Sequence, residues 1–226
     1  MNEPTAKVRV WDLPTRIFHW ALAVTVLTSI ITAHVGGNAM QWHVGCGMVA
    51  LILLTFRILW GLVGGRWSRF ASFIYSPGTV LRYLRGQARA DEHLDVGHNP
   101  LGSGSVFALL GLLALQVATG LVADDEIATQ GPLNRLVSSE TASQATGWHK
   151  DIGQWILVAL ITLHVAAIVF YKLKKGKNLV TPMVLGDKDL PSSTPGSADG
   201  WKPRVLALAL LVVSWAFAGW VWSRGG

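Results

Sequence analysis

The sequence predicts an all-α membrane protein, namely a four-helix transmembrane bundle followed by a fifth, C-terminal transmembrane helix. Of the 226 residues, 51% are hydrophobic and only 14% are charged, whereas a soluble domain usually carries about 25% charged residues. The apolar residues are concentrated in long runs that mostly lack the polar face of a soluble core helix. Both observations are typical of a chain that crosses a bilayer several times.

Five segments have the length of about 20 residues that a transmembrane helix needs. They are residues 17–35, 42–63, 102–122, 152–171 and 205–222. Each is expected to be a helix, because backbone groups in lipid must find hydrogen-bond partners within their own segment. The first run is long for the apolar region of a signal peptide and further spans follow it, so we interpret it as a retained helix.

Lys and Arg residues determine the expected orientation. They gather before the first span and in the loops after the second and fourth spans, which all lie on one side of a membrane. The other side carries only Arg135, Lys150 and Arg224, together with acidic residues 124–126. The positive-inside rule therefore predicts a multi-pass protein of the bacterial inner membrane, with a cytoplasmic N-terminus and a periplasmic C-terminus. This topology explains the net charge of +6, so we expect contact with membrane lipid and no binding to nucleic acid.

Composition also suggests how the chain is divided. Residues 186–203 are rich in Pro, Ser and Gly, which predicts a flexible cytoplasmic linker. The linker separates a four-helix core, residues 1–185, from residues 204–226, an accessory C-terminal transmembrane helix whose apolar run has no His. Cys46 is the one cysteine, so no disulfide within the chain is expected.

Four of the seven histidines fall at two depths of the predicted bundle. His19 begins the first helix on the cytoplasmic side, and His43 begins the second on the outer side. His149 lies at the outer end of the fourth helix, and His164 follows fifteen residues later, a rise of roughly 22 Å. At about 100° per residue, the last two lie only about 60° apart around the helix. We therefore expect His43 to face His149 outside and His19 to face His164 inside.

Two histidines that face each other across a bundle are what a six-coordinate haem requires. The sequence thus predicts two haem b groups, with these four histidines as iron ligands and with no catalytic residue. The motif WHVGCG at residues 42–47 recurs as WHKDIG at residues 148–153. Gly47 and Gly153 lie about one turn after each histidine, and we expect them to leave room for the flat macrocycle. The alternative is that these small residues serve close packing of helices.

Arg57 lies deep within an apolar run, where a charge is costly unless it is paired. It lies about 21 Å deeper along the second helix than His43, near the predicted inner haem. Two interpretations remain open: a bidentate contact with a haem propionate, or snorkelling of the side chain to the cytoplasmic headgroups. Arg16, at the interface, is a second candidate for the same propionates.

The other histidines have weaker patterns around them. His34, near the outer end of the first helix, is the second choice for the outer haem, because it lacks the Trp and Gly neighbours. His93 and His98 lie in a polar cytoplasmic loop, where a solvated, structural role is expected.

The chain resembles the bacterial cytochrome b561 family, which includes the b-type subunits of nickel-iron hydrogenases. The resemblance covers about residues 8–185 and depends on RIFHW, WHVGCGMVALILLTFRILWG, GHNPLGS, TGL and TGWHKDIGQWILVALITLHV, in this order. It implies four helices that hold two b haems, with His19, His43, His149 and His164 as ligands. Members of the family usually transfer electrons between the quinone pool and a partner such as a hydrogenase or a periplasmic cytochrome c. The fifth helix departs from this pattern.

The sequence therefore predicts a di-haem membrane cytochrome that transfers electrons between quinone or quinol and a redox partner, either a cytochrome or an oxidoreductase subunit. Such a protein is an electron carrier, or one part of a quinone-linked oxidoreductase. Two other classes remain open. One is a haem-free, histidine-lined metal or proton transporter, although the four histidines lie at two depths and do not converge. The other is a membrane anchor without a redox role. Whether the chain forms homo- or hetero-oligomers is open as well.

Overall fold

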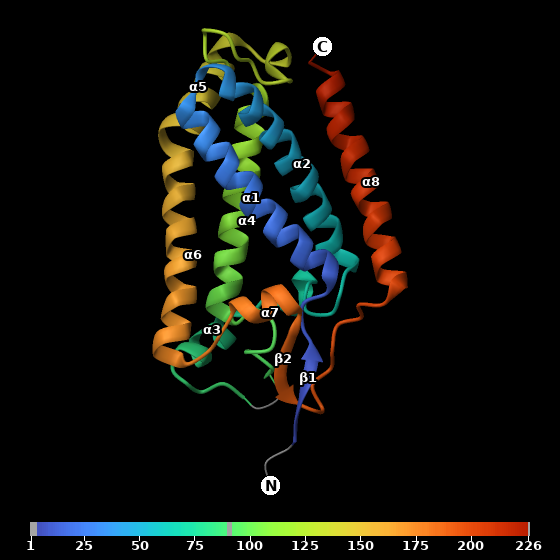
Figure 1. Ribbon diagram of the computed structural model, residues 1–226. Helices are drawn as coiled ribbons and strands as arrows, with labels where there is room; N and C mark the ends of the chain where they lie inside the picture. The colour runs from blue at the N-terminus through green and yellow to red at the C-terminus, as the bar shows by residue number, and fades with distance from the viewer. Residues whose placement is uncertain (1–3, 90–91, 226) are drawn as a thin grey trace. The chain divides into compact units, whose positions relative to one another are not determined.

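The structure, a computed structural model, describes residues 4–89 and 92–225. Within these ranges five helices are long and apolar enough to cross a membrane (Figure 1). They are α1 (Leu13–Val35), α2 (Met40–Val63), α4 (Pro100–Val122), α6 (Gln154–Lys175) and α8 (Trp201–Ser223). The predicted all-α fold class and the five spans are confirmed. Several helices begin before the predicted range, because a first turn accepts the proline and polar residues that interrupt an apolar run.

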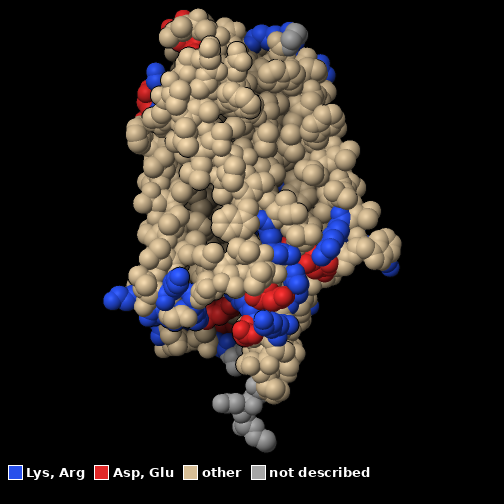
Figure 2. Space-filling view, viewed as in Figure 1, with Lys and Arg blue, Asp and Glu red and all other residues tan. Residues whose placement is uncertain are grey.

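The long helices expose large apolar side chains. Trp42 of α2 is 72% exposed, and Leu163 of α6 and Val212 of α8 are each 65% exposed. Figure 2 shows a broad surface without charged side chains on this face of the molecule. Leaving so much apolar surface in water would be unfavourable, by roughly 25 cal/mol per Å², whereas lipid accepts it. The chain is a multi-pass membrane protein.

Shorter elements connect the long helices. They are β1 (Thr5–Arg9), α3 (Pro77–Leu84), α5 (Ser139–Gly147), the π-helix η5 (Trp148–Gly153), α7 (Val180–Leu185) and β2 (Asp187–Pro191). The π-helix lies directly before α6 and contains His149. Its i→i+5 hydrogen bonds place more residues in each turn than an α-helix has. The predicted angle of 60° between His149 and His164 assumed one regular helix, so that value no longer holds.

The chain forms two compact units, which are described separately. The second unit comprises Phe18–Phe56, Ala108–Thr162 and the chain from Ala209 onward. All four helices of the predicted bundle contribute to its buried core. The core side chains are Val26 of α1, Ala50 and Leu54 of α2, Leu113 and Val117 of α4, and Leu157 of α6.

The first unit comprises the chain up to Ile17, Arg57–Phe107 and Leu163–Leu208. In it β1 and β2 pair as antiparallel strands, with Thr5 opposite Pro191 and Arg9 opposite Asp187 (Figure 1). Composition alone did not predict this strand within residues 186–203, because its pairing partner lies at the other end of the sequence. The division of the chain at 185/186 and 203/204 stays a prediction.

Asp199 joins several basic groups of the first unit. Its carboxylate accepts hydrogen bonds from Arg9 Nη1 at 3.0 Å, from Arg204 Nε at 3.4 Å and from the backbone N–H of Leu13 at 3.0 Å. Arg16 Nη2 lies 3.8 Å from the same carboxylate. One largely buried acidic side chain thus holds the N-terminal segment against the start of α8.

Asp12, directly before α1, is the centre of a buried polar network. Its carboxylate accepts hydrogen bonds from Ser68 Oγ at 2.7 Å, Trp60 Nε1 at 3.1 Å and the backbone N–H of Thr15 at 2.8 Å. The last of these is an N-cap contact, which satisfies a free N–H of the first helical turn. Asp12 is fully buried, so its charge depends on these partners and on the nearby cation of Arg57.

Candidate functional site

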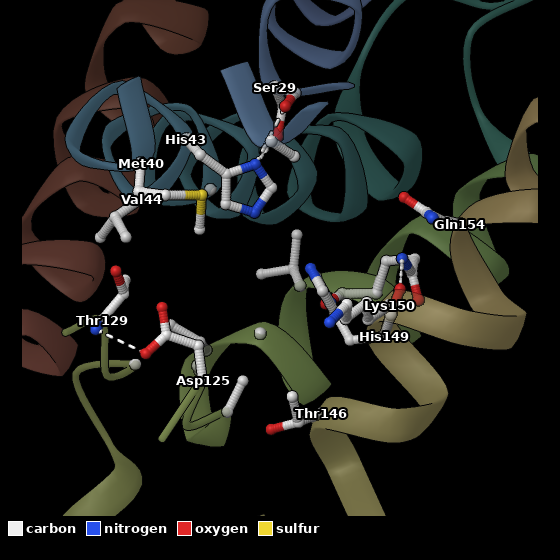
Figure 3. A pocket seen from close by; sticks show the side chains of 18 of the residues that line it. Ser29, Met40, His43, Val44, Asp125, Thr129, Thr146, His149, Lys150 and Gln154 are labelled. Atoms are coloured by element: carbon white, nitrogen blue, oxygen red, sulfur yellow. Dashed lines mark hydrogen bonds between the residues drawn. The ribbon is translucent and has the colours of Figure 1, made fainter. Parts of the chain in front are cut away.

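A cavity of about 820 Å³ lies within the second unit. Its lining comes from α1, α2, α4, η5 and the loop that follows α4, and it includes His34, His43 and His149. Figure 3 shows His43 and His149 pointing into the same space from different helices. The volume falls within the usual range for a ligand or cofactor pocket, roughly 300–1,000 Å³.

The two imidazole rings of His43 and His149 are a matched pair. Their centroids lie 5.9 Å apart and their planes are almost perpendicular, at 84°. A metal ion that binds one nitrogen of each ring at about 2 Å holds the two ring centres roughly 6 Å apart. The observed spacing therefore fits a single metal atom with one histidine on each side.

Each of these histidines has one ring nitrogen bonded to protein. His43 Nδ1 lies 2.9 Å from the carbonyl oxygen of Ser29 and 3.1 Å from Ser29 Oγ. His149 Nδ1 lies 2.9 Å from the carbonyl oxygen of Gln116, and Thr119 Oγ1 is 3.3 Å away. A carbonyl can only accept, so both Nδ1 atoms carry the proton and both Nε2 atoms keep a free lone pair. This is the arrangement that metal-binding histidines usually show.

The glycines near the histidines differ in their surroundings. Gly47 lines the cavity, and a Cβ there would meet nothing within 4 Å; its role in making room for haem stays a prediction. A Cβ at Gly120 would stand only 2.9 Å from His149 Cε1. The position that a Cβ on Gly153 would take is filled by the side chains of Gln116 and Trp148. This glycine therefore makes room for those two side chains.

The loop after α4 borders the cavity and contains the acidic residues 124–126. Asp125 Oδ1 accepts three backbone hydrogen bonds, from Ile127, Ala128 and Thr129, at 2.8–3.0 Å. Asp124 accepts from Gln130 Nε2 at 2.9 Å and from the backbone N–H of Glu126 at 2.8 Å. Two of the three carboxylates therefore hold the loop in its conformation.

Asp125 is expected to make this loop sensitive to acid. Its backbone hydrogen bonds, led by the one from Thr129, lower the pKa of the carboxyl from 3.8 to about 2. A lowered pKa contributes stability that is fully present above pH 3.8 and is lost as the pH falls through about 2. We expect Asp125→Asn to lower the melting temperature at pH 7, and the difference from the wild type to shrink between pH 4 and pH 2. Glu126→Gln removes an exposed charge next to it and is the control, and equal melting temperatures for the two variants would contradict the assignment.

The other predicted site residues lie as follows. His34 borders the cavity but is exposed, with Nδ1 on the carbonyl oxygen of Ile30 at 2.9 Å. His19 lies in the second unit, with its ring 5.0 Å from that of Trp20. His164 belongs to the first unit, so the pairing of His19 with His164 stays a prediction.

The two arginines have protein partners. Arg57 is 3% exposed and donates from Nη1 to the carbonyl oxygen of Ser68 at 3.0 Å, while its guanidinium lies 4.6 Å over the ring of Phe70. The snorkelling interpretation is therefore wrong, because a buried carbonyl and an aromatic face take up the cation. Arg16 Nη1 donates to the carbonyl oxygen of Val184 at 2.6 Å. Contact of either arginine with a haem stays a prediction.

His98 differs from the expectation of a solvated loop residue. Its ring packs between Trp11 and Phe73, at centroid distances of 4.7 and 4.6 Å. The hydroxyl of Tyr75 donates to its carbonyl oxygen at 2.6 Å. His93, by contrast, is exposed.

The paired histidines and their cavity agree with what comparison with known proteins shows. A family model described as prokaryotic cytochrome b561 matches residues 10–186. The chain belongs to the prokaryotic cytochrome b561 family. It is a b-type membrane cytochrome that transfers electrons, and a b-type cytochrome carries haem b. The matched residues end before α8.

Similar curated proteins share most of their length with this cytochrome. The probable Ni/Fe-hydrogenase B-type cytochrome subunit of Bradyrhizobium diazoefficiens is 25% identical over 83% of this chain and 87% of its own. The probable Ni/Fe-hydrogenase 1 B-type cytochrome subunit of Escherichia coli is 23% identical over 78% of this chain and 88% of its own. The probable Ni/Fe-hydrogenase B-type cytochrome subunit of Rhodobacter capsulatus is 26% identical over 80% of this chain and 81% of its own. No solved structure matches the chain significantly.

The sequence did not reveal the hydrogen-bond partners of the two histidines. Ser29 and Gln116 accept from them through backbone carbonyls, and a carbonyl leaves no signal in the residue type. Both acceptors lie on helices other than the one that carries the histidine. The packing of α1 against α2, and of α4 against η5, selects them.

Proposed function

We propose that this cytochrome holds two haem b groups and passes electrons between the quinone pool and a redox partner. His43 and His149 are the proposed axial ligands of the outer haem. The observation that supports this most is the pair of facing rings, 5.9 Å apart, with both Nδ1 atoms on carbonyl oxygens. His19 and His164 are proposed as ligands of the inner haem on the sequence pattern alone.

The described residues prepare the outer site for electron transfer in three ways. The hydrogen bonds from Nδ1 fix each ring and leave Nε2 to bind iron. If both histidines bound one iron, they would leave no open position for oxygen or a substrate, which would favour electron transfer over oxygen chemistry. The apolar core beside the site, with Val117 and Leu157, lowers the polarity on one side of the cavity. Bound haem supplies a one-electron couple, whose potential the protein sets.

The partner and the orientation are proposed from weaker observations. The similar proteins from Bradyrhizobium and Escherichia coli are named as hydrogenase subunits, which favours an oxidoreductase as the partner over a soluble cytochrome. The distribution of Lys and Arg supports a bacterial inner-membrane location with a cytoplasmic N-terminus and a periplasmic C-terminus.

The optical spectrum tests the proposal directly. Protein purified in mild detergent is expected to show a Soret band and an alpha band that sharpen on reduction, with two haems per chain by pyridine haemochrome assay. A chain that folds, melts cooperatively and contains no haem would overturn the proposed function and favour the transporter or the anchor. A ratio of one haem per chain would remove the inner site from the proposal and keep the outer one.

A further inference from the structure

Gln116 of α4 contacts His149 at two points. Its carbonyl oxygen accepts the ring Nδ1–H at 2.9 Å, and its side-chain Nε2 donates to the carbonyl oxygen of His149 at 3.0 Å. Gln116 is only 5% exposed, so both bonds are protected from water. One residue thus holds both the ring and the backbone of a proposed haem ligand.

The remaining side-chain atom of Gln116 faces a second buried group. Trp148 Nε1 lies 2.8 Å from the point where a Cβ on Gly153 would stand, and Gln116 Oε1 lies closer still to that point. Both atoms are buried, and neither has a hydrogen-bond partner among the described residues. An N–H donor and a carbonyl acceptor are therefore close together in a place where an unmade hydrogen bond is costly.

The orientation of the Gln116 amide follows from these contacts. If its oxygen and nitrogen were exchanged, an oxygen would face the carbonyl of His149 and an NH₂ group would face the indole N–H. Both pairs would repel, so Nε2 stays on His149 and Oε1 stays beside Trp148. The glycine at position 153 is required because these two side chains occupy the space of a Cβ.

The two WH motifs of the sequence are not equivalent in this respect. Trp42, which precedes His43, is 72% exposed and lies in a regular α-helix. Trp148 lies in the π-helix, and its indole nitrogen is buried. Single π-helical turns are frequent at functional sites, and here Trp148 of this turn lies beside Gln116.

We propose that Gln116 and Trp148 form a latch that positions His149 and thereby sets the reduction potential of the outer haem. The indole N–H of Trp148 donates to Gln116 Oε1, directly or through one water molecule, and this fixes the amide that holds His149. The proposal rests on the proposed function, since it takes His149 as a haem ligand. A firm Nδ1–H···O bond makes the imidazole a stronger donor to iron, which stabilises the ferric form and keeps the potential low.

The test compares three variants with the wild type, all as full-length, haem-loaded protein. Gln116→Leu removes both side-chain contacts and keeps the backbone carbonyl, and Trp148→Phe removes only the indole N–H. Trp42→Phe is the matched control for the second change, because Trp42 has the same place in the other motif. The measurements are haem content, the redox titration of each haem component, and the low-spin ferric EPR signal of the outer haem.

We expect the first two variants to keep their haem and to raise the potential of one component. The effect of losing such a supporting contact is about tenfold in the reduction equilibrium, or about 59 mV for one electron, and the EPR signal shifts with it. Trp42→Phe is expected to match the wild type. Equal potentials and EPR signals in all four proteins would overturn the latch.

A further variant, His149→Ala, distinguishes failure of the latch from failure of the proposed function. If it removes one haem component while Gln116→Leu and Trp148→Phe match the wild type, the latch is wrong and the proposed function stands. If His149→Ala keeps both components, the outer haem is not where the proposed function places it.

Discussion

Replacing His43 by alanine is expected to remove one of the two haem components and to spare the other. The ring of His43 faces that of His149 across the cavity, 5.9 Å away, so without it only one of the two proposed histidines would remain to bind the iron. Haem content is expected to fall from about two to about one per chain, with loss of one component from the reduced-minus-oxidised spectrum. Pyridine haemochrome assay and a redox titration measure both effects.

His34→Ala is the matched control for this experiment. His34 borders the same cavity, but it is exposed and its Nδ1 is bonded within its own helix, so both haem components are expected to remain. His164→Ala is expected to remove the other component. Loss of the same component in His43→Ala and His164→Ala would contradict the assignment of the two pairs.

Replacing Asp12 by alanine is expected to destabilise the first unit strongly. The change leaves the Thr15 N–H, the Trp60 indole and the Ser68 hydroxyl without their acceptor, and it removes a buried negative charge that acts on Arg57. Leaving a buried donor without its acceptor costs about 1–3 kcal/mol for each group, so the total loss is about 3–5 kcal/mol. For a chain of this size the melting temperature should fall by about 10 °C, as followed by circular dichroism in detergent.

Two further variants make the result specific. Asp189→Ala removes an exposed carboxylate from the same unit and is expected to change stability by less than about 0.5 kcal/mol. Asp12→Asn keeps an acceptor for Thr15, so its melting temperature is expected to lie between those of the two alanine variants. A melting temperature of Asp12→Ala equal to that of Asp189→Ala would contradict a central role for this network.

The spanning helices could be predicted from the sequence because lipid makes length and hydropathy sufficient. A run such as 102–122 has one stable conformation in a bilayer, an α-helix with internal hydrogen bonds. The strands β1 and β2 could not be predicted in this way. Each has five residues, and Arg9 and Asp187 are separated by 178 positions, so neither strand has a local signal and only tertiary pairing creates them.

For the candidate site, depth along the helices was enough to predict that His43 and His149 lie close together. The detail of the site depended on packing. The repeat WHVGCG and WHKDIG suggested two equal environments, yet Gly47 is open and Gly153 is filled. The cause is the π-helix at 148–153, which similar residues in α2 do not form. The protein partners of Arg57, the carbonyl of Ser68 and the ring of Phe70, likewise became visible only in the fold.

The pairing of β1 with β2 has a consequence for biosynthesis. A ribosome adds about 5–20 residues per second, so the first strand waits roughly 10–40 s before residues 187–191 exist. During that time its edge is unpaired, and unpaired edges invite contact with other chains. Arg9 meets Asp187 and Asp199 only afterwards. Closure of the sheet therefore comes only after the helices α1, α2, α4 and α6 have been made.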